Sequence, residues 1–223
     1  VFSMKGELGS VTGGQEHCIE LEASPKKCKP YPVPHALKGV VRDQVEEMLA
    51  QGVIRKCVSP YASPVLLVPK RQTPGEPPSY RFCTDFRALN QVTVKDRHPL
   101  PRIESLLAAV GPESCVFTQL DQKAAYWQMP IRECDQGKTA FVTDDGQYCY
   151  KVMAYGLCNG PSSYQRMMNE ILGDLMWKSV LVYLDDVLIF SSSVEEHIRV
   201  LREVFRRFRA HNLKLNPAKC RFA

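Results

Sequence analysis

Two short apolar runs flank a pair of adjacent aspartates. Val180–Leu184 precedes Asp185 and Asp186, and Val187–Phe190 follows them. Both runs are rich in β-branched and aromatic residues, and such runs around a short polar turn predict an antiparallel hairpin with the two carboxylates at its tip. Adjacent negative charges between apolar strands are unfavourable unless they face water or a cation. An ordinary exposed turn, in which aspartate is common, is the alternative.

A third carboxylate, Asp121, ends another strand-like run, Val116–Asp121. If this strand joins the same sheet, Asp121 comes to the edge at which Asp185 and Asp186 lie. Mg²⁺ prefers oxygen ligands, and two such ions about 4 Å apart can activate an attacking hydroxyl and stabilise the leaving oxygen of an in-line phosphoryl displacement. Three convergent carboxylates are therefore typical of a polymerase or nuclease site.

The rest of the chain predicts an α+β protein. Residues 1–34 are rich in glycine and proline and indicate an extended lead-in. Helices are expected at Val41–Leu49, which Gly52 closes, at Ile103–Val110, from Pro161 to about Leu172, and at Ser193–Asn212. Strands at Val65–Val68 and Tyr80–Thr84 predict a hairpin with a basic tip over Arg71–Ser79. No glycine-rich βαβ turn occurs, so a sheet covered by helices on one face fits better than a Rossmann fold.

The last helix has the strongest pattern. Ser193 and Glu196 form a capping box at its start. Apolar residues then recur at helical spacing and are expected to be buried beneath the sheet: Val194, Ile198, Leu201, Val204, Phe205 and Phe208. The arginines of this helix are expected to face outward.

Charge and cysteine content narrow the class of protein. The formal net charge of the 223 residues is +5, and positive charge concentrates in Lys70–Arg102 and Glu195–Ala223, as binding to a nucleic-acid backbone would favour. A solvated helix face is the alternative, and charge alone favours it. No apolar run approaches the roughly 18 residues of a membrane span, and no secretory signal is recognisable. The nine cysteines never form CxxC, so we expect no zinc ribbon, no membrane association, and an intracellular setting, in a cytoplasmic particle or the nucleus.

Six ordered motifs give the chain a specific resemblance. They are Gly52-Val53-Ile54 with Ser59–Pro64, Tyr80–Asn90, Leu120-Asp121 with Tyr126-Trp127-Gln128, Lys138–Phe141, Tyr155-Gly156-Leu157 with Asn159 and Pro161, and Tyr183–Asp186. In this order and spacing, over roughly His17 to Phe222, the chain resembles the reverse transcriptase domain of gypsy-type LTR retrotransposon Pol polyproteins. More distantly, it is similar to retroviral reverse transcriptases.

The resemblance implies a right-hand polymerase with fingers and palm and without a thumb. It implies an extended lead-in over 1–34, mostly fingers with the start of the palm over 35–120, and mostly palm over 121–223, with a returning fingers segment near 130–152. The chain ends where the family continues into the Tyr-Leu-Gly primer grip, the thumb and ribonuclease H. We therefore expect that ribonuclease H belongs to a parent polyprotein and that the isolated chain holds a primer poorly.

The resemblance also implies a role for individual residues. Asp121, Asp185 and Asp186 match the catalytic metal ligands, with Asp121 and Asp185 the principal ligands of two Mg²⁺ or Mn²⁺ ions. Residues that match dNTP-binding positions are Lys70, Arg81, Ala124, Ala125, Tyr126 and Tyr155, with Tyr126 as the gate against a ribose 2′-hydroxyl. Residues that match template-binding positions are Arg87, Asn90 and Gly156.

Structural explanations compete with several of these roles. Tyr126 fits a core aromatic equally well, Lys70 and Arg81 fit plain hairpin charges, and pairing with a nearby arginine fits Asp85 better than catalysis. The chain departs from the family at Gln122 and Lys123, which replace a more usual apolar-basic pair.

The implied activity is RNA-directed DNA polymerisation, a nucleotidyl transfer from a dNTP to a primer 3′-hydroxyl. The implied partners are an RNA or DNA template with its primer, dNTPs, and a second polymerase chain in a dimer. The alternative is a truncated or domesticated element fragment that binds nucleic acid or a partner chain without catalysis.

Overall fold

The computed structural model describes residues 1–3, 7–13, 15–26, 28–70 and 78–223. The chain divides into two compact units, each built from separate stretches of sequence. The first unit comprises Val1–Glu16, Asp96–Pro130 and Asn159–Ala223, and the second comprises His17–Lys95 and Ile131–Cys158.

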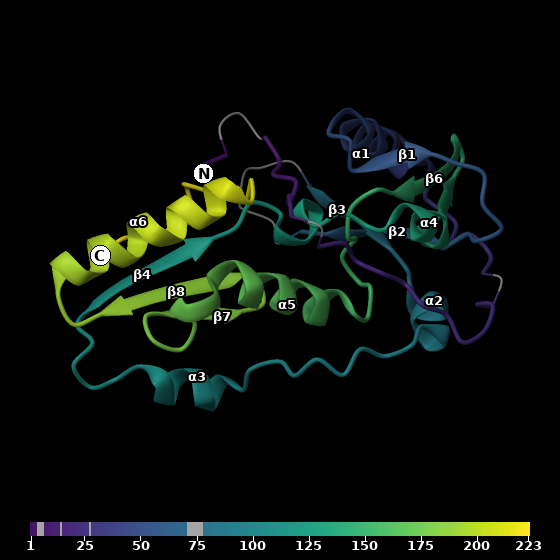
Figure 1. Ribbon diagram of the computed structural model, residues 1–223. Coiled ribbons are helices and arrows are strands. Elements are labelled where there is room, and N and C mark those ends of the chain that lie inside the picture. The colour runs from purple at the N-terminus through teal and green to yellow at the C-terminus, as the bar shows by residue number, and fades with distance from the viewer. Residues whose placement is uncertain (4–6, 14, 27, 71–77) are drawn as a thin grey trace. The chain divides into compact units, whose positions relative to one another are not determined.

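The first unit contains a three-stranded antiparallel sheet in the order β4-β8-β7 (Figure 1). Its strands are β4 (Val116–Asp121), β7 (Val180–Tyr183) and β8 (Asp186–Ser191), and its helices are α3 (Ile103–Ala109), α5 (Gly160–Leu172) and α6 (Val194–Ala210), with short 3₁₀ turns at Ala125–Gln128 and Gly173–Leu175. Alternation along each strand separates two faces, and helices α5 and α6 pack on the face that carries Leu120, Val187 and Ile189.

The opposite face of this sheet is also partly covered. Leu106 of α3 packs against Leu181 and Phe190, with Val110 beside them. The prediction of helices on one face only was therefore incomplete, because these strands are apolar on both faces. Helix α3 buries Leu106 but leaves Ile103 and Leu107 exposed.

Helix α6 begins after Ser193 as predicted, but it ends at Ala210, two residues before the predicted end, and its buried face differs from the predicted one. Ser193 caps the helix by accepting a hydrogen bond from the Glu196 N–H at 3.3 Å. Val204 and Phe208 are buried as expected, whereas 57% of Val194 and 43% of Ile198 are exposed, so their predicted burial is wrong.

A buried histidine explains why the buried face of α6 differs from the predicted one. His197 is 3% exposed and bonds through its ring nitrogens to the hydroxyls of Thr118 at 2.8 Å and Ser191 at 3.1 Å. Its polar atoms are hydrogen-bonded within the core, so the histidine can be buried there. It takes the buried place on the helix that the apolar pattern assigned to Val194 and Ile198. Burial lowers the pKa of His197 below its ordinary value, which keeps the ring neutral.

The arginines of α6 lie at the surface, as predicted, with one exception. Arg202, Arg206 and Arg209 are exposed, and Arg206 pairs with Glu203. The Arg207 side chain is only 18% exposed and reaches the last turn of α5, where its guanidinium donates to the carbonyl of Leu172 at 2.6 Å. A cation at a helix C-terminus satisfies carbonyls that have no partner within the helix.

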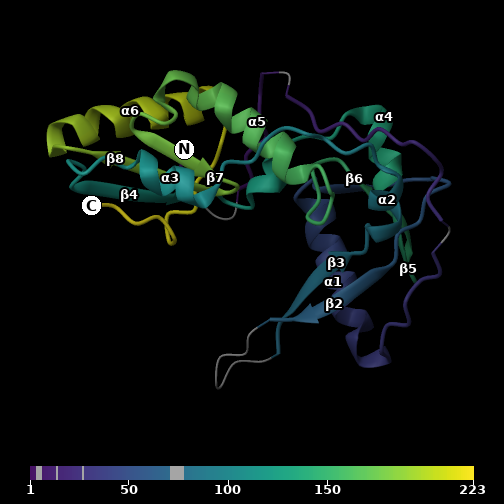
Figure 2. The ribbon, with the colours of Figure 1, turned by 90° about the horizontal axis from the view of Figure 1, so that it is seen from below.

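The second unit contains a sheet in the order β1-β6-β5 and a separate hairpin of β2 and β3. Its strands are β1 (Ile54–Lys56), β2 (Val65–Pro69), β3 (Tyr80–Thr84), β5 (Phe141–Thr143) and β6 (Gly146–Tyr150), and its helices are α1 (Lys38–Ala50), α2 (Arg87–Val92) and α4 (Glu133–Gln136), with 3₁₀ turns at His35–Leu37 and Gly137–Thr139. Helix α1 packs beside β3 (Figure 2). Residues 71–77 of the predicted basic tip lie outside the described residues.

A buried ion cluster stabilises the second unit. Asp135 is 1% exposed and accepts hydrogen bonds from the backbone N–H of Ile19 and from the side chains of Lys138 and Arg132. Burial alone would raise the pKa of Asp135, but these hydrogen bonds outweigh it and lower the pKa.

Within the described ranges, no helix is both long and apolar enough to cross a membrane.

Candidate functional site

The three aspartates lie at one edge of the first unit's sheet. Strand β4 pairs with β8 in a register that places Asp121 directly opposite Asp186, and β7 pairs with β8 so that Tyr183 also lies opposite Asp186. Directly opposed Cα atoms in an antiparallel pair are about 4.5–5.5 Å apart. Asp185 occupies the two-residue turn between β7 and β8, so the predicted neighbourhood of the three residues is present in the backbone.

The turn that carries Asp185 has an unusual conformation. Leu184 has a φ of 56°, in the left-handed region, which a side chain with a Cβ occupies at a penalty of about 1–2 kcal/mol. A positive φ at the first central position fits the tight hairpins that match the twist of the flanking strands. Asp185 and Asp186 are both exposed, so both carboxylates face solvent.

Other polar groups contact two of the carboxylates. The Gln119 amide donates to Asp186 Oδ1 at 3.1 Å, and Lys219 Nζ lies 3.7 Å from Asp121 Oδ2. In the described part of the chain, no three His, Cys, Asp or Glu side chains are arranged to hold a metal ion. The donor set nevertheless fits a hard divalent cation, because all three groups are carboxylates and the register brings two of them face to face.

The segment after β4 has a left-handed residue and is hydrogen-bonded to a buried glutamine. Ala124 has φ 45° and ψ 55°, and the 3₁₀ turn Ala125–Gln128 follows it. A left-handed residue next to a helical one turns successive N–H groups toward one point and forms an anion-binding concavity. Gln128 is fully buried, donates to the carbonyls of Lys123 at 2.7 Å and Lys214 at 2.9 Å, and accepts from the Lys214 N–H at 2.7 Å.

A buried tyrosine lies beneath this segment. Tyr164 of α5 is 0% exposed, and its hydroxyl donates to the side-chain oxygen of Gln122, the residue after Asp121. Its ring also contacts the ring of Tyr126, with centroids 5.5 Å apart at 45°. Sequence reasoning missed Tyr164, and the only signal was the polar Gln122 at a position expected to be apolar.

The remaining candidate residues belong to the second unit. Lys70 directly follows β2 and Arg81 lies on β3 opposite Val68; both cations are exposed. Tyr155 is 52% exposed, and Gly156 beside it has a φ of 94°, which favours glycine.

The two predicted template-binding residues of α2 make intramolecular bonds. Arg87 donates two hydrogen bonds to the Asp85 carboxylate, from Nε at 3.0 Å and from Nη2 at 2.7 Å. The Tyr31 hydroxyl also donates to Asp85 and accepts from Arg87 Nη2. The Arg87 guanidinium lowers the pKa of Asp85, and the pairing expected for Asp85 is present. The Asn90 amide donates to the Gly156 carbonyl at 2.7 Å and accepts from the Cys158 N–H at 3.0 Å.

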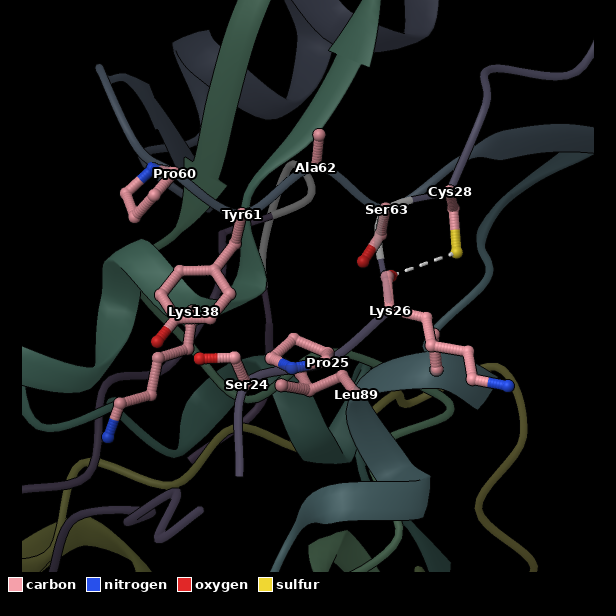
Figure 3. A pocket seen from close by; sticks show the side chains of 11 residues that line it. Ser24, Pro25, Lys26, Cys28, Pro60, Tyr61, Ala62, Ser63, Leu89 and Lys138 are labelled. Carbon is pink, nitrogen blue, oxygen red and sulfur yellow. Dashed lines mark hydrogen bonds between the residues drawn. The ribbon is translucent and has the colours of Figure 1, made fainter. Parts of the chain in front are cut away.

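A pocket of about 380 Å³ lies beside α2 in the second unit. Pro25, Pro60, Tyr61 and Leu89 give it apolar walls, and Ser24 and Ser63 add hydroxyls (Figure 3). The ammonium group of Lys138, which also lines the pocket, bonds to the Ile19 carbonyl and to Asp135. The pocket therefore combines apolar walls and one aromatic ring with hydroxyl and ammonium groups.

Comparison with known proteins identifies the family. The model of the reverse transcriptase (RNA-dependent DNA polymerase) family matches residues 68–223. The chain belongs to the reverse transcriptase family. It is 40% identical over 98% of its length to the retrovirus-related Pol polyprotein from transposon 297 of Drosophila melanogaster and 36% identical over 86% to the transposon Tf2-3 polyprotein of Schizosaccharomyces pombe. It spans only 21% and 14% of these polyproteins. The resemblance to retrotransposon reverse transcriptases is confirmed.

Solved structures show the same fold. The foamy viral protease-reverse transcriptase in complex with RNA/DNA hybrid matches 98% of this reverse transcriptase chain with a TM-score of 0.85, at 20% identity and over 28% of that protein. The same viral protein in complex with double-stranded DNA matches with a TM-score of 0.84, at 20% identity, over 98% of this chain and 44% of the other. The predicted α+β right-hand polymerase fold is confirmed. Members of this family generally use divalent metal ions.

Proposed function

We propose that this chain is the polymerase portion of a reverse transcriptase, which adds dNTPs to a primer 3′-hydroxyl on an RNA or DNA template. The observation that carries the proposal is the register that sets Asp121 opposite Asp186, next to Asp185 in the turn. Asp121 and Asp185 would be the principal ligands of two Mg²⁺ or Mn²⁺ ions, and Asp186 would complete the set. Such ions, when bound, stabilise the charge on the attacking and leaving oxygens.

The protein's own groups position the nucleotide in this proposal. The N–H groups around Ala124 and Ala125 would bind phosphate oxygens in the concavity that the left-handed Ala124 forms. Tyr126 would place its ring against the sugar and exclude a 2′-hydroxyl. In the second unit, the exposed cations Lys70 and Arg81 suit a triphosphate, because ammonium and guanidinium groups bind phosphate strongly.

The template contacts are proposed for the second unit. Arg87 leaves 80% of its side chain exposed although it is paired with Asp85, so its outer edge can meet a phosphate. Asn90 would act by holding Gly156, and Tyr155 and Gly156 would meet the new base pair. The pocket beside α2 suits an unpaired template base, which stacks on aromatic surfaces such as Tyr61.

The parent polyprotein is proposed to carry ribonuclease H, and pairing with a second polymerase chain is proposed for the assembled enzyme.

Single-nucleotide primer extension tests the proposed activity, both for this chain and for the longer polyprotein that contains it. Asp185→Asn removes a charged ligand and is expected to abolish extension in Mg²⁺. Asp174→Asn is the matched control, because Asp174 is an exposed aspartate of the same unit that pairs with Arg207.

Three results would decide the matter. Extension by the unaltered protein and by Asp174→Asn, but not by Asp185→Asn, supports the proposal. Extension that survives Asp185→Asn contradicts it. Nucleic-acid binding without extension, in both the chain and the polyprotein, favours the alternative of a non-catalytic element fragment.

A further inference from the structure

Gln122 is a polar side chain within an apolar core. It follows Asp121 in the chain, and because successive side chains of an extended segment point to opposite sides, Gln122 points inward where Asp121 points outward. Gln122 is 4% exposed, and its neighbours Leu120 and Leu215 are fully buried. A buried amide is unfavourable unless it is hydrogen-bonded.

Helix α5 supplies the partners that this amide needs. The Tyr164 hydroxyl donates to Gln122 Oε1, and Gln122 Nε2 lies 3.6 Å from the sulfur of Met168. Tyr164 and Met168 are both fully buried. The bond therefore fixes the Gln122 side chain against α5, where an apolar side chain would have several ways to pack.

Backbone bonds hold the same segment from its other side. The Asp121 carbonyl accepts from the Asn216 N–H at 2.9 Å, and the Lys123 N–H donates to the Lys214 carbonyl at 3.0 Å. Between these two bonds, the side chain of Gln122 is the direct link to α5. The hydrogen bond between Gln122 and Tyr164 thus links the segment that carries Asp121 to α5.

Tyr164 has a second contact, with the ring of Tyr126. We propose that Tyr164 is a positioning residue with two separable effects: its hydroxyl orients Asp121 through Gln122, and its ring sets the position of Tyr126. The inference rests on the proposed function, in which Asp121 binds metal and Tyr126 meets the sugar. It adds a residue that contacts neither the metal nor the sugar.

Metal binding can be tested without catalysis. Mn²⁺ binding to the purified chain is measured by electron paramagnetic resonance for the unaltered protein, Asp121→Asn and Tyr164→Phe. Tyr164→Phe removes one oxygen and is expected to weaken Mn²⁺ binding about tenfold, the lower end of what loss of a ligand's supporting partner causes. Gln122→Leu in the Tyr164→Phe background replaces both polar groups by apolar ones, so it is expected to recover the melting temperature but not the Mn²⁺ affinity.

Tyr150→Phe is the matched control. Tyr150 is a buried tyrosine of the second unit, and its hydroxyl bonds to Thr84 at 3.0 Å. Its substitution also removes a buried hydrogen bond and is expected to lower the melting temperature by a similar amount, with Mn²⁺ affinity unchanged. Equal effects of Tyr150→Phe and Tyr164→Phe on both measurements would show that Tyr164 contributes stability alone, and would overturn the inference.

The ring is tested separately, by the ratio of dNTP to rNTP incorporation in the extension assay. Tyr164→Phe keeps the ring and is expected to leave this ratio within about twofold, whereas Tyr164→Leu removes the support of Tyr126 and is expected to lower it about tenfold, the effect of a small misplacement. An unchanged ratio in Tyr164→Leu overturns this half of the inference.

The failure of this inference and the failure of the proposed function give different results. If Asp121→Asn abolishes Mn²⁺ binding and Tyr164→Phe leaves it intact, the metal site stands and the positioning role of the hydroxyl is wrong. If the unaltered chain binds no Mn²⁺, or if Asp121→Asn binds it normally, the metal site is wrong and the role of Tyr164 falls with it.

Discussion

Arg206 and Arg207 offer a direct comparison of an exposed and a half-buried arginine that share one acid. Both pair with Glu203 at 2.7 Å. Arg206 leaves 67% of its side chain exposed, whereas Arg207 is 18% exposed and also reaches the Leu172 carbonyl and Asp174. We predict that Arg207→Met destabilises the first unit far more than Arg206→Met does.

The expected size follows from the contacts. The charge-assisted bond to a helix-end carbonyl contributes about 1.5–3 kcal/mol, and the interaction of the cation with the end of α5 adds about 0.3–1 kcal/mol. The exposed ion pairs add about 0–1 kcal/mol. Methionine keeps the apolar contacts of the arginine stem, so Arg207→Met is expected to lower the free energy of unfolding by about 2–4 kcal/mol, and Arg206→Met by about 0–0.5 kcal/mol.

Urea denaturation followed by tryptophan fluorescence measures this difference. The chain has two tryptophans, Trp127 and Trp177, and both belong to the first unit, so their signal reports the unit that contains α5 and α6. Equal losses for Arg206→Met and Arg207→Met would contradict this prediction, because the bond to the α5 carbonyl would then have no measurable effect.

Three further perturbations have defined outcomes. Gly9→Ala would place its Cβ 2.5 Å from the Asn212 carbonyl oxygen and closer still to Gln128 Oε1, so the melting temperature should fall, with a loss of about 1–3 kcal/mol by denaturation. Because burial lowers the pKa of His197, the unfolded state binds a proton that the folded state does not, so stability should fall as the pH drops below about 6.5, and His197→Gln should flatten that slope in urea melts from pH 7.5 to 5. Asp135→Asn should lower the free energy of unfolding by about 2–3 kcal/mol at pH 7 and by less at low pH, because the stability that comes from the lowered pKa of the folded carboxylate is fully present above the unfolded pKa and is lost as the pH falls through the folded pKa.

Local patterns in the sequence predicted most of the elements. Strand β4 has the predicted ends, because its run of strand-forming residues stops at a carboxylate. Helix α6 begins where the cap residue Ser193 placed it. The burial of Val194 and Ile198 was predicted wrongly, because periodicity cannot show that His197 finds hydroxyl partners on β4 and β8.

Local sequence patterns do not specify which distant residues of the chain pair with each other. The sequence suggested that Asp121 reaches the sheet edge of Asp185 and Asp186, but the register opposite Asp186 depends on how two strands 65 residues apart pair. The bond between Gln122 and Tyr164 likewise joins residues 42 positions apart. The functions assigned to the aspartates, to Lys70 and Arg81, and to the template residues stay predictions.

The location of Mn²⁺ in a crystal tests directly whether Asp121 and Asp185 hold the metal ions. Crystals of the protein with template, primer and dNTP are soaked in Mn²⁺, and its anomalous scattering marks each ion. We predict anomalous peaks at coordination distance from carboxylate oxygens of both Asp121 and Asp185. Anomalous peaks confined to other parts of the protein, with these carboxylates free of metal, would show that the three aspartates are not the metal site.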